Sequence, residues 1–386
     1  MSAAPNSSAE KIHPLTSLRF FAAFFVVIYH TLGNLVRGQF LPGNIDTPHP
    51  ADALPNFGSR FLSLGFVSVS FFFLLSGYIL AIVYLRREKP IDRRKFFIAR
   101  FARVYPLFFI TLLMDLPFAF RGLARLSSVH HALLKVPLNF VVETLMLHAW
   151  LVKFAGINFP NWSLSAETLF YLSFPFIGPA LWRLRGTARW TAVVLLFVGG
   201  QAIVFAWSTF FDLSPFQPIP LLHLSTFALG ILLASWQFDS QSKSPQSWQA
   251  YTALAAAAIA TVAVVEISPW VPLHNLGDGI LAPIFMLLIW ALSSSSTVFA
   301  RLLSVPWLVV LGEASFGLYL LHIPMLHIFE SIHSIAQPWA YALYLALTIT
   351  LSVLSFYFVE APLRRWILAS FDKRPRESME AASIAQ

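Results

Sequence analysis

Long apolar stretches, separated by short polar segments, run through almost the whole chain. A helix that crosses a lipid bilayer needs about 20 consecutive apolar residues. Stretches of about this length predict ten transmembrane helices, at residues 15–34, 61–84, 101–120, 161–182, 190–210, 219–236, 250–269, 276–292, 307–330 and 339–363. The pattern therefore predicts an all-α fold, a polytopic transmembrane helical bundle of about ten spans. The membrane domain would occupy residues 15–365, between short tails at residues 1–14 and 366–386.

One further apolar stretch, residues 133–152, is a weaker candidate because polar residues interrupt it. Lys135, Asn139, Glu143 and His148 all fall inside it. Counting it as a span would turn every later helix over and would place the basic C-terminal segment outside the cell. We therefore expect this stretch to stay on the outer side, as a re-entrant segment.

The basic residues predict the orientation of the bundle. With ten spans and a cytoplasmic N-terminus, most of the 26 Lys and Arg residues fall in inner segments, as the positive-inside rule requires. Both termini are therefore predicted to be cytoplasmic. Arg121 and Arg125, which fall on the outer side, fit this orientation least well.

The composition agrees with a membrane protein. Only 11% of the residues are charged and 57% are hydrophobic, with a mean hydropathy of +0.69, whereas soluble domains are about 25% charged. This excludes a soluble enzyme, a disordered chain and a nucleic-acid-binding protein, even though the net charge is +8. The chain has no cysteine, which also excludes a disulfide framework, a thiolate nucleophile and a Cys-ligated metal. No metal site is predicted.

Ionisable residues inside the spans are informative because each is costly unless it is paired or functional. The first span contains Arg19 and His30. At about 100° per residue they share one face of a helix, separated by about 16 Å along its axis. Arg19 would lie near the cytoplasmic end and His30 toward the outer side. The structural alternatives are a snorkelling anchor for Arg19 and a packed interhelical hydrogen bond for His30.

Charged residues also gather at the predicted cytoplasmic ends of other spans. Arg100 and Arg103 lie one helical step apart at the start of the span at 101–120. Such a fork suits a phosphate or pyrophosphate group, and the alternative is anchoring to anionic lipid headgroups. Near the inner end of the last span, Glu360 precedes Arg364 by four residues, which predicts an intrahelical ion pair.

A polar cluster opens the span at 161–182, on its predicted outer side. Its members are Trp162, Ser163, Ser165 and Glu167. The predicted topology places this cluster at the depth of His30. A carboxylate two turns into a Phe-rich helix needs a partner or a function. The structural alternative is a helix cap from one of the serines, with the glutamate as an acidic residue near the helix start.

Two other places within spans have residues suited to a binding site. Ser76 and Gly77 stand near the end of the second span, where a small residue lets another backbone or a ligand come close. Tyr319 and His322 precede Pro324, and a proline kink can place the histidine on the wall of a cavity.

Six segments follow one another along nearly the whole chain: Arg19 with His30, then 71–77 (FFFLLSG), 100–106 (RFARVYP), 162–167 (WSLSAE), 319–324 (YLLHIP) and 360–362 (EAP). In this order they resemble the acyltransferase-3 family of integral membrane O-acyltransferases. The chain departs from the family pattern in lacking an acidic residue and a glycine before Arg19 and before the aromatic run at 71–73.

The resemblance implies transfer of an acyl group, most often acetyl, from cytoplasmic acyl-CoA to a hydroxyl of an extracytoplasmic or lipid-linked glycan at a bacterial inner membrane. It implies that His30 is the essential histidine, that Arg19 is its companion, and that Arg100 and Arg103 form the cytoplasmic arginine motif. No permanently bound cofactor is implied, because acyl-CoA is a co-substrate. The other partners would be the glycan and membrane lipids.

These observations combine into a hypothesis about mechanism. Acyl-CoA would bind through its phosphates on the inner side and reach up along the first span, and the residues proposed to bind it are Arg100, Arg103, Ser76 and Gly77. His30 would act as general base on the acceptor hydroxyl, with Arg19 and Glu167 as further catalytic residues. Glu167 would either orient and stabilise the charged imidazole or position the acceptor.

The acceptor and the oxyanion of the tetrahedral intermediate also need partners. The residues proposed for these tasks are Trp162, Ser165, Tyr319 and His322, with Trp162 stacking on a sugar ring. Ser76 and His322 are the alternative oxyanion donors. Because the chain ends about twenty residues after its last span, the membrane domain itself is expected to engage the acceptor. Two rival functions remain, a transporter and a non-catalytic subunit of a polysaccharide export system.

Overall fold

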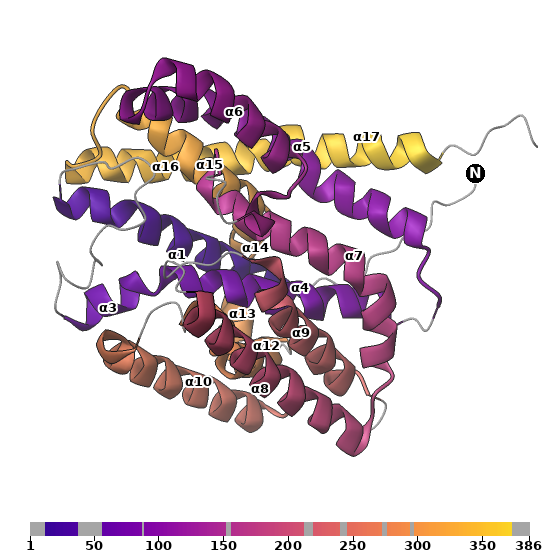
Figure 1. Cartoon of the computed structure of the whole chain (residues 1–386). Helices are drawn as coiled ribbons and strands as arrows, with labels where there is room; N and C mark the ends of the chain where they lie inside the picture. Colours follow the sequence, from indigo (N-terminus) through magenta and orange to yellow (C-terminus); the bar gives the residue numbers. More distant parts are fainter. Residues whose placement is uncertain are drawn as a thin grey trace, which may run out of the picture.

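The chain folds as a bundle of helices in the computed structural model (Figure 1). The residues that the structure describes are 12–37, 56–86, 89–151, 156–211, 219–239, 245–271, 276–293 and 297–372. No strand occurs in these ranges, and all of their regular elements are helical. The predicted all-α fold is therefore confirmed.

The α-helices, in chain order, are α1 (His13–Arg37), α3 (Phe57–Ser63), α4 (Ser68–Tyr84), α5 (Arg93–Leu126), α6 (Val129–Thr144), α7 (Trp162–Trp182), α8 (Gly186–Phe211), α9 (Leu224–Gln237), α10 (Ser247–Ile267), α12 (Ala282–Leu292), α13 (Val298–Leu302), α14 (Pro306–Glu313), α15 (Ser315–Glu330), α16 (Pro338–Ser355) and α17 (Ala361–Asp372). The short 3₁₀ helices are η1 (Gly65–Val67), η2 (His148–Trp150), η3 (Phe159–Asn161), η4 (Pro220–His223) and η5 (Ser268–Trp270). A π-helical turn, η6 (Phe356–Glu360), joins α16 to α17.

Seven helical stretches of the described chain are long and apolar enough to cross a membrane, and the pair α14 and α15, bent by 57°, would be an eighth span. The two other predicted spans are also helical but do not meet that test. One of them, α12, has only 11 residues. The other, α7, opens on the polar WSLSAET sequence and contains Pro175 and Pro179. All ten predicted stretches thus fall on helices.

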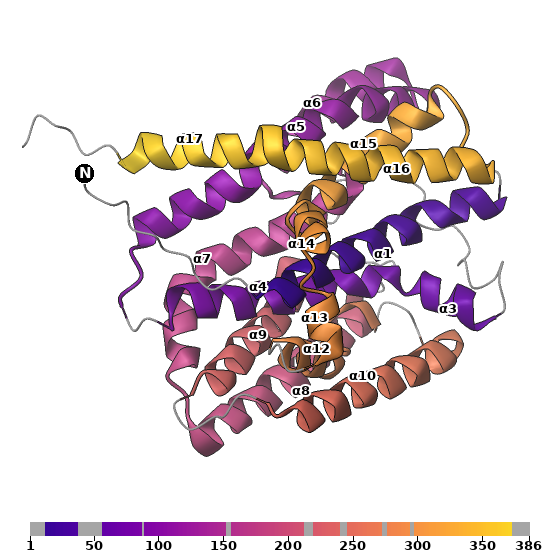
Figure 2. The ribbon, with the colours of Figure 1, turned by 180° about the vertical axis from the view of Figure 1, so that it is seen from behind.

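Basic residues that the sequence analysis assigned to the inner side gather at one end of the bundle. The end of α4, the start of α5 and the end of α17 lie at one end of the bundle in both views (Figure 1, Figure 2). This end therefore gathers the basic start of α5. Helix α3 and the start of α16 lie at the opposite end. Which side of the membrane each end faces stays a prediction.

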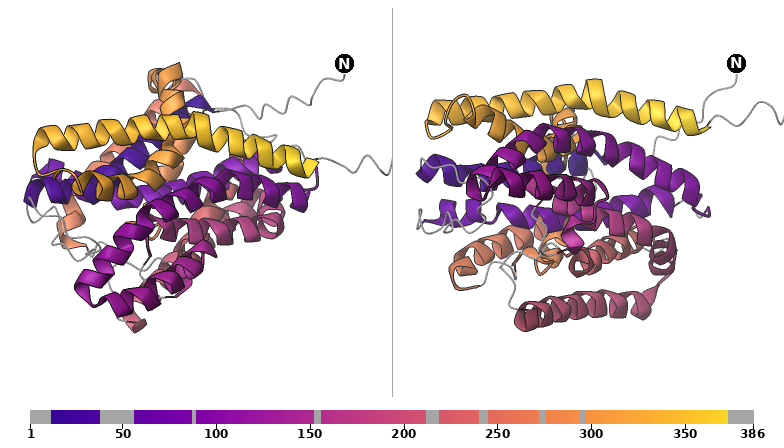
Figure 3. Two further views of the ribbon diagram at one scale, coloured as in Figure 1. Left: turned by 90° about the horizontal axis from the view of Figure 1, so that it is seen from above. Right: turned by 45° about the horizontal axis from the view of Figure 1, so that its top comes forward.

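The interrupted stretch at 133–152 forms α6 and η2 and is not among the candidate spans. Helix α6 folds back beside α5, as Figure 3 shows. Several of its apolar side chains are exposed, among them Leu133, Leu134 and Val141. The segment thus packs against α5, a candidate span, but α6 is shorter than a span itself.

Helices α4 and α9 pack backbone to backbone, through one glycine on each. A Cβ added to Gly77 would lie 2.0 Å from the carbonyl oxygen of Phe227, and one added to Gly230 would lie 2.0 Å from that of Leu74. The close neighbour that Gly77 admits is therefore the backbone of α9, as in ordinary helix packing. Ser76, the residue before it, is half-buried.

We expect Gly77→Ala to destabilise the bundle by about 1–3 kcal/mol, because the added methyl group forces the two backbones apart. The measurement is the midpoint of thermal unfolding of the purified protein in detergent. Gly199→Ala is the matched control, since a Cβ added there meets nothing within 4 Å. An unchanged midpoint for Gly77→Ala would show that α4 and α9 do not cross this closely.

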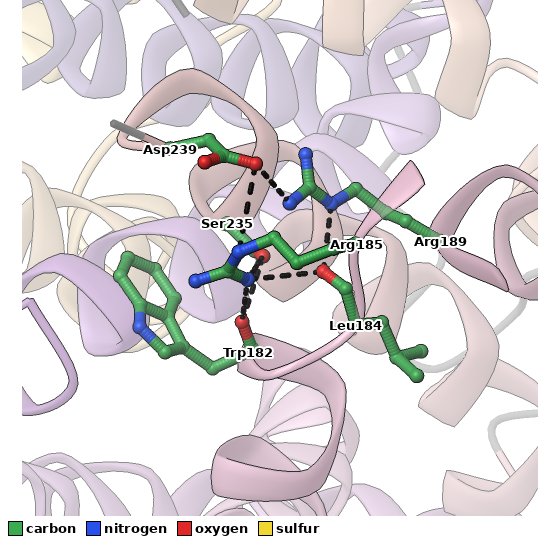
Figure 4. Close-up of polar contacts among 6 residues, drawn as sticks. All are labelled: Trp182, Leu184, Arg185, Arg189, Ser235 and Asp239. Atoms are coloured by element: carbon green, nitrogen blue, oxygen red, sulfur yellow. Dashed lines mark hydrogen bonds and ion pairs between the residues drawn. The ribbon is translucent and has the colours of Figure 1, made fainter. Parts of the chain in front are cut away.

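Arg185, just after α7, and Arg189, in the first turn of α8, bind backbone and side-chain groups within the protein (Figure 4). Arg189 Nη2 lies 2.7 Å from Asp239 Oδ2, and its Nε–H donates to the carbonyl oxygen of Leu184 at 3.0 Å. Arg185 donates to the carbonyl oxygens of Trp182 and Leu184. Carbonyl groups at a helix end have no partner within the helix. These basic residues therefore close the end of α7 and tie it to α8 and to the segment after α9.

Candidate active site

Two histidines, one from α1 and one from α15, meet inside the bundle. His30 Nδ1 lies 2.9 Å from His322 Nε2, and the two rings are nearly parallel, with an angle of 8° between their planes. His322 is fully buried, whereas His30 is half-buried. The structure thus joins two residues that the sequence analysis treated as separate candidates.

The hydrogen bonds of His322 assign the tautomers of this histidine pair. His322 Nδ1 lies 2.6 Å from the backbone carbonyl oxygen of Tyr319, which can only accept, so Nδ1 carries the hydrogen. A neutral His322 then offers the lone pair of Nε2 to the Nδ1–H group of His30. His30 Nε2 is left as the unprotonated nitrogen.

Helix α7 is joined to α15 one turn before His322. The hydroxyl oxygens of Tyr319 and Ser163 are 2.8 Å apart. Both hydroxyls also lie within hydrogen-bond distance of the carbonyl oxygen of Pro160, at 3.1 Å and 3.0 Å. Tyr344 donates to the carbonyl oxygen of His322 at 2.8 Å. The backbone that carries His322 is therefore held from α7 and from α16.

Trp162 and Ser165 contact residues outside the pair of His30 and His322. The Trp162 ring is buried and packs against the rings of Phe73 and His223, at centroid distances of 6.0 and 5.3 Å. Ser165 Oγ lies 3.3 Å from His148 Nδ1, in η2. This packing gives no support to sugar stacking by Trp162.

A second polar group, which we term the charge cluster, consists of Arg19, Arg100, Arg103, Glu167 and Glu360. Its members come from α1, α5, α7 and η6. Arg103 Nη1 lies 3.7 Å from Glu360 Oε2. Arg19 interacts electrostatically with Arg103, Glu167 and Glu360. The structure thus brings the predicted arginines of the first and third spans together.

Arg100 is only partly satisfied within this cluster. Its Nη2 donates to the Tyr84 hydroxyl at 3.4 Å, and its guanidinium lies over the rings of Tyr84 and Tyr171, at 5.7 and 5.9 Å. Its Nε atom is buried with no hydrogen-bond partner, and so are both carboxylate oxygens of Glu360. Buried polar atoms are nearly always hydrogen-bonded. An unsatisfied guanidinium nitrogen is therefore a candidate donor to an anionic ligand.

Glu167 lies with the arginines and not beside the imidazole. Its carboxylate accepts a hydrogen bond from the Tyr171 hydroxyl at 2.8 Å and interacts electrostatically with Arg19, Arg103 and Arg100. Among the described contacts, none joins Glu167 to His30. The predicted contact between carboxylate and imidazole is thus replaced by one between carboxylate and guanidinium groups.

Glu360 also has a partner that the sequence did not predict. It is the last residue of the π-helical turn, and its ion pair is with Arg103 on α5. No ion pair with Arg364 occurs in the described part of the chain. The contact across to α5 thus takes the place of the expected contact within one helix.

Two buried carboxylates that contact α15 or the segment before α7 received no role from the sequence. Asp115 on α5 is hydrogen-bonded to His327. Glu143 on α6 accepts hydrogen bonds from the segment that precedes α7. The available signal was the polar interruption of the 133–152 stretch, together with the Asn-Phe-Pro-Asn sequence at 158–161.

Comparison with known proteins supplies the chemistry that such a site serves. The family model described as an acyltransferase domain matches residues 13–357. The chain belongs to the acyltransferase-3 family. Together with its apolar helices, this membership marks it as an integral membrane protein and supports membrane O-acyltransferase activity.

Curated proteins similar to this acyltransferase-3 chain are named acyltransferases or O-acetyltransferases. It is 28% identical to acyltransferase MdmB of Streptomyces mycarofaciens over 333 residues, which cover 81% of this chain and 78% of that protein. It is 24% identical to O-acetyltransferase OatA of Staphylococcus aureus strain MRSA252 over 396 residues, which cover 95% of this chain but only 60% of that protein. No solved structure matches the chain.

Proposed function

We propose that this acyltransferase transfers an acetyl group from cytoplasmic acetyl-CoA to a hydroxyl of a cell-surface or lipid-linked glycan, with His30 as the general base. The observation that carries the proposal is the hydrogen-bonded chain from His30 through His322 to the Tyr319 carbonyl. Family membership supports acyl transfer, and the name of OatA supports an acetyl group and an oxygen acceptor. The glycan class follows from the family resemblance.

The charge cluster supports binding of the donor. Acyl-CoA carries phosphate groups at one end and its thioester at the other. In the proposal, Arg100 and Arg103 bind the phosphates, because guanidinium groups suit phosphate geometry and Arg100 Nε is buried without a partner. Arg19 and His30 lie on one helix, so the thioester end can extend along α1 toward the histidine pair.

The proposed reaction has two steps. The acceptor hydroxyl oxygen attacks the thioester carbonyl carbon while His30 Nε2 takes the hydroxyl proton. The tetrahedral intermediate then expels the CoA thiolate, and His30 returns the proton to that sulfur. His322 accepts the hydrogen bond from His30 Nδ1 throughout, which fixes the ring and stabilises the imidazolium form.

The hydrogen bonds limit the candidates for stabilising the oxyanion. An oxyanion needs a donor at the position where its charge develops. His322 uses Nδ1–H on the Tyr319 carbonyl, and its Nε2 faces His30, so it has no N–H group left to offer. Of the two predicted donors, Ser76 on α4 remains in the proposal.

The proposed location is the cytoplasmic membrane of a bacterium, with the charge cluster toward the cytoplasm. The basic end of the bundle supports this orientation, and the bacterial origin of MdmB and OatA supports the source. The partners in this proposal are acyl-CoA, the glycan and the surrounding lipid.

The test uses inside-out membrane vesicles that contain the protein, supplied with acetyl-CoA labelled in the acetyl group. We expect free CoA and labelled glycan to appear in equal amounts, because each transfer breaks one thioester and forms one ester. A transporter would move glycan without releasing CoA. A non-catalytic export subunit would release none and would not bind acetyl-CoA.

A further inference from the structure

A proline in α15 leaves one carbonyl group without a helical partner. Pro324 has no N–H, so it cannot donate to the carbonyl oxygen of Leu320, four residues earlier. The structure fills this gap from another part of the chain. Asn158 Nδ2 donates to the Leu320 carbonyl oxygen at 3.1 Å, and Asn158 is fully buried. A carbonyl oxygen can only accept, so the orientation of the Asn158 amide is assigned.

Asn158 is in turn held by Glu143. The Glu143 carboxylate accepts hydrogen bonds from the backbone N–H groups of Ile157 and Asn158 and from Asn161 Nδ2, the last at 2.7 Å. Glu143 is fully buried, as are Asn158 and Asn161. Three donors to one buried carboxylate hold the 156–161 segment against α6, so that its amide group reaches α15.

The point of contact lies next to the histidine pair. Leu320 follows Tyr319, whose carbonyl oxygen accepts the hydrogen bond from His322 Nδ1. The Tyr319 hydroxyl donates a hydrogen bond to the carbonyl oxygen of Pro160, in the same segment as Asn158. A shift of the backbone at Leu320 would therefore move both the acceptor of His322 Nδ1 and the ring itself.

We propose that Glu143 and Asn158 are positioning residues for His322. They keep α15 in the register in which His322 meets His30, by supplying the hydrogen bond that Pro324 cannot make. Neither residue touches the reacting atoms in this proposal. Its consequence for the rate rests on the proposed acetyl transfer, whereas its consequence for the tautomer of His322 does not.

The test compares Asn158→Ala in two backgrounds. In the native background the Leu320 carbonyl loses its partner. In the Pro324→Ala background, the new N–H at residue 324 can donate to that carbonyl, which makes the Asn158 amide dispensable. If Asn158 did not act through the Leu320 carbonyl, its loss would cost the same in both backgrounds.

The first readout is the ¹⁵N spectrum of the histidine side chains in detergent. The signal of His322 as the Nδ1–H tautomer is identified by its absence from His322→Gln. We expect Asn158→Ala to change this signal and Asn158→Ala/Pro324→Ala to restore it. Asn56→Ala is the matched control, because Asn56 also bonds to backbone from a loop, at the start of α3, and it should leave the signal unchanged.

The second readout is the rate of acetyl transfer in the vesicle assay. Loss of a well-positioned group lowers turnover more than binding. We expect kcat to fall about tenfold for Asn158→Ala, with the KM for acetyl-CoA changed less than about twofold, and Pro324→Ala to recover most of the loss. If Asn158→Ala does not fold, Glu143→Gln is measured in the same two ways, since it keeps the side-chain shape but can no longer accept from all three donors.

An unchanged His322 signal in a folded Asn158→Ala protein would overturn the proposal. An equal loss of rate in both backgrounds would overturn it too. If the protein is not an acetyltransferase, no variant shows transfer, but the spectrum still reports whether Asn158 holds His322. Failure of the positioning role and failure of the proposed reaction therefore give different results.

Discussion

Replacing His30 by alanine lowers the rate of acetyl transfer by about 10²–10⁴-fold, the usual contribution of a general base. The proposed reaction depends on the unprotonated Nε2 of His30, which takes the proton of the acceptor hydroxyl. The measurement is the initial rate of label transfer from acetyl-CoA to glycan with equal amounts of folded wild-type and variant protein. A wild-type rate for His30→Ala would refute the mechanism.

Two companion variants sharpen this prediction. His130→Ala is the matched control, because His130 is exposed on α6 and its loss should leave the rate unchanged. His322→Ala should also reduce kcat, because His30 then loses the acceptor of its Nδ1–H group. Residues that act as one unit have effects that do not add. The double variant His30→Ala/His322→Ala should therefore be no slower than His30→Ala alone.

Replacing Arg100 by alanine raises the KM for acetyl-CoA by about 10- to 100-fold, because a hydrogen bond to a charged group contributes about 1.5–3 kcal/mol. The loss should be confined to substrates that carry the CoA phosphates. S-acetylpantetheine, which has the thioester but not those phosphates, should show the same KM with wild-type protein and with Arg100→Ala. The measurement is the dependence of the initial rate on the concentration of each donor.

The control for this prediction is Arg121→Ala. Arg121 lies on the same helix, near its opposite end, and is exposed, so its loss should leave both KM values unchanged. If Arg100→Ala weakened S-acetylpantetheine as much as acetyl-CoA, the arginine would be acting on the thioester end or on the fold. The charge cluster would then not be the phosphate site.

The helices could be predicted from the sequence because hydropathy is a local property. Each of the ten apolar stretches falls on helical structure, and the polar interruption at 133–152 correctly set that segment apart from the candidate spans. The family could be predicted for a similar reason, since each of its motifs is a short run of neighbouring residues. Neither inference needs to know which helices touch.

The contacts within the site depend on how helices are rotated against one another, and hydropathy does not determine this. His30 and His322 are separated by 292 residues in the chain, so no spacing rule relates them. Glu167 shares a helical face with Tyr171, and only packing against α5 turns that face toward Arg100. The predicted depth of Glu167 gave no information on the direction in which its side chain points.

Local irregularities of the backbone were equally hidden. The π-helical turn that ends at Glu360 has no signal in the hydropathy pattern, and neither has the pairing of Glu360 with Arg103 on α5 in place of Arg364. The hydrogen bond from Asn158 to the Leu320 carbonyl could be predicted in part. The missing N–H of Pro324 could be read from the sequence, but the residue that replaces it is more than 160 positions away.

The hydrogen-bonded chain from His30 ends at the backbone carbonyl of Tyr319. A peptide carbonyl accepts a hydrogen bond but does not take up a proton, so this chain offers no path by which a proton could leave toward either aqueous phase. In the proposed reaction, the proton removed from the acceptor returns to the sulfur of CoA through the same imidazole. Acylation would then move no net charge across the bilayer. The energy for modifying a glycan outside the cell would come from the thioester alone, and the electrochemical gradient would neither drive nor oppose it.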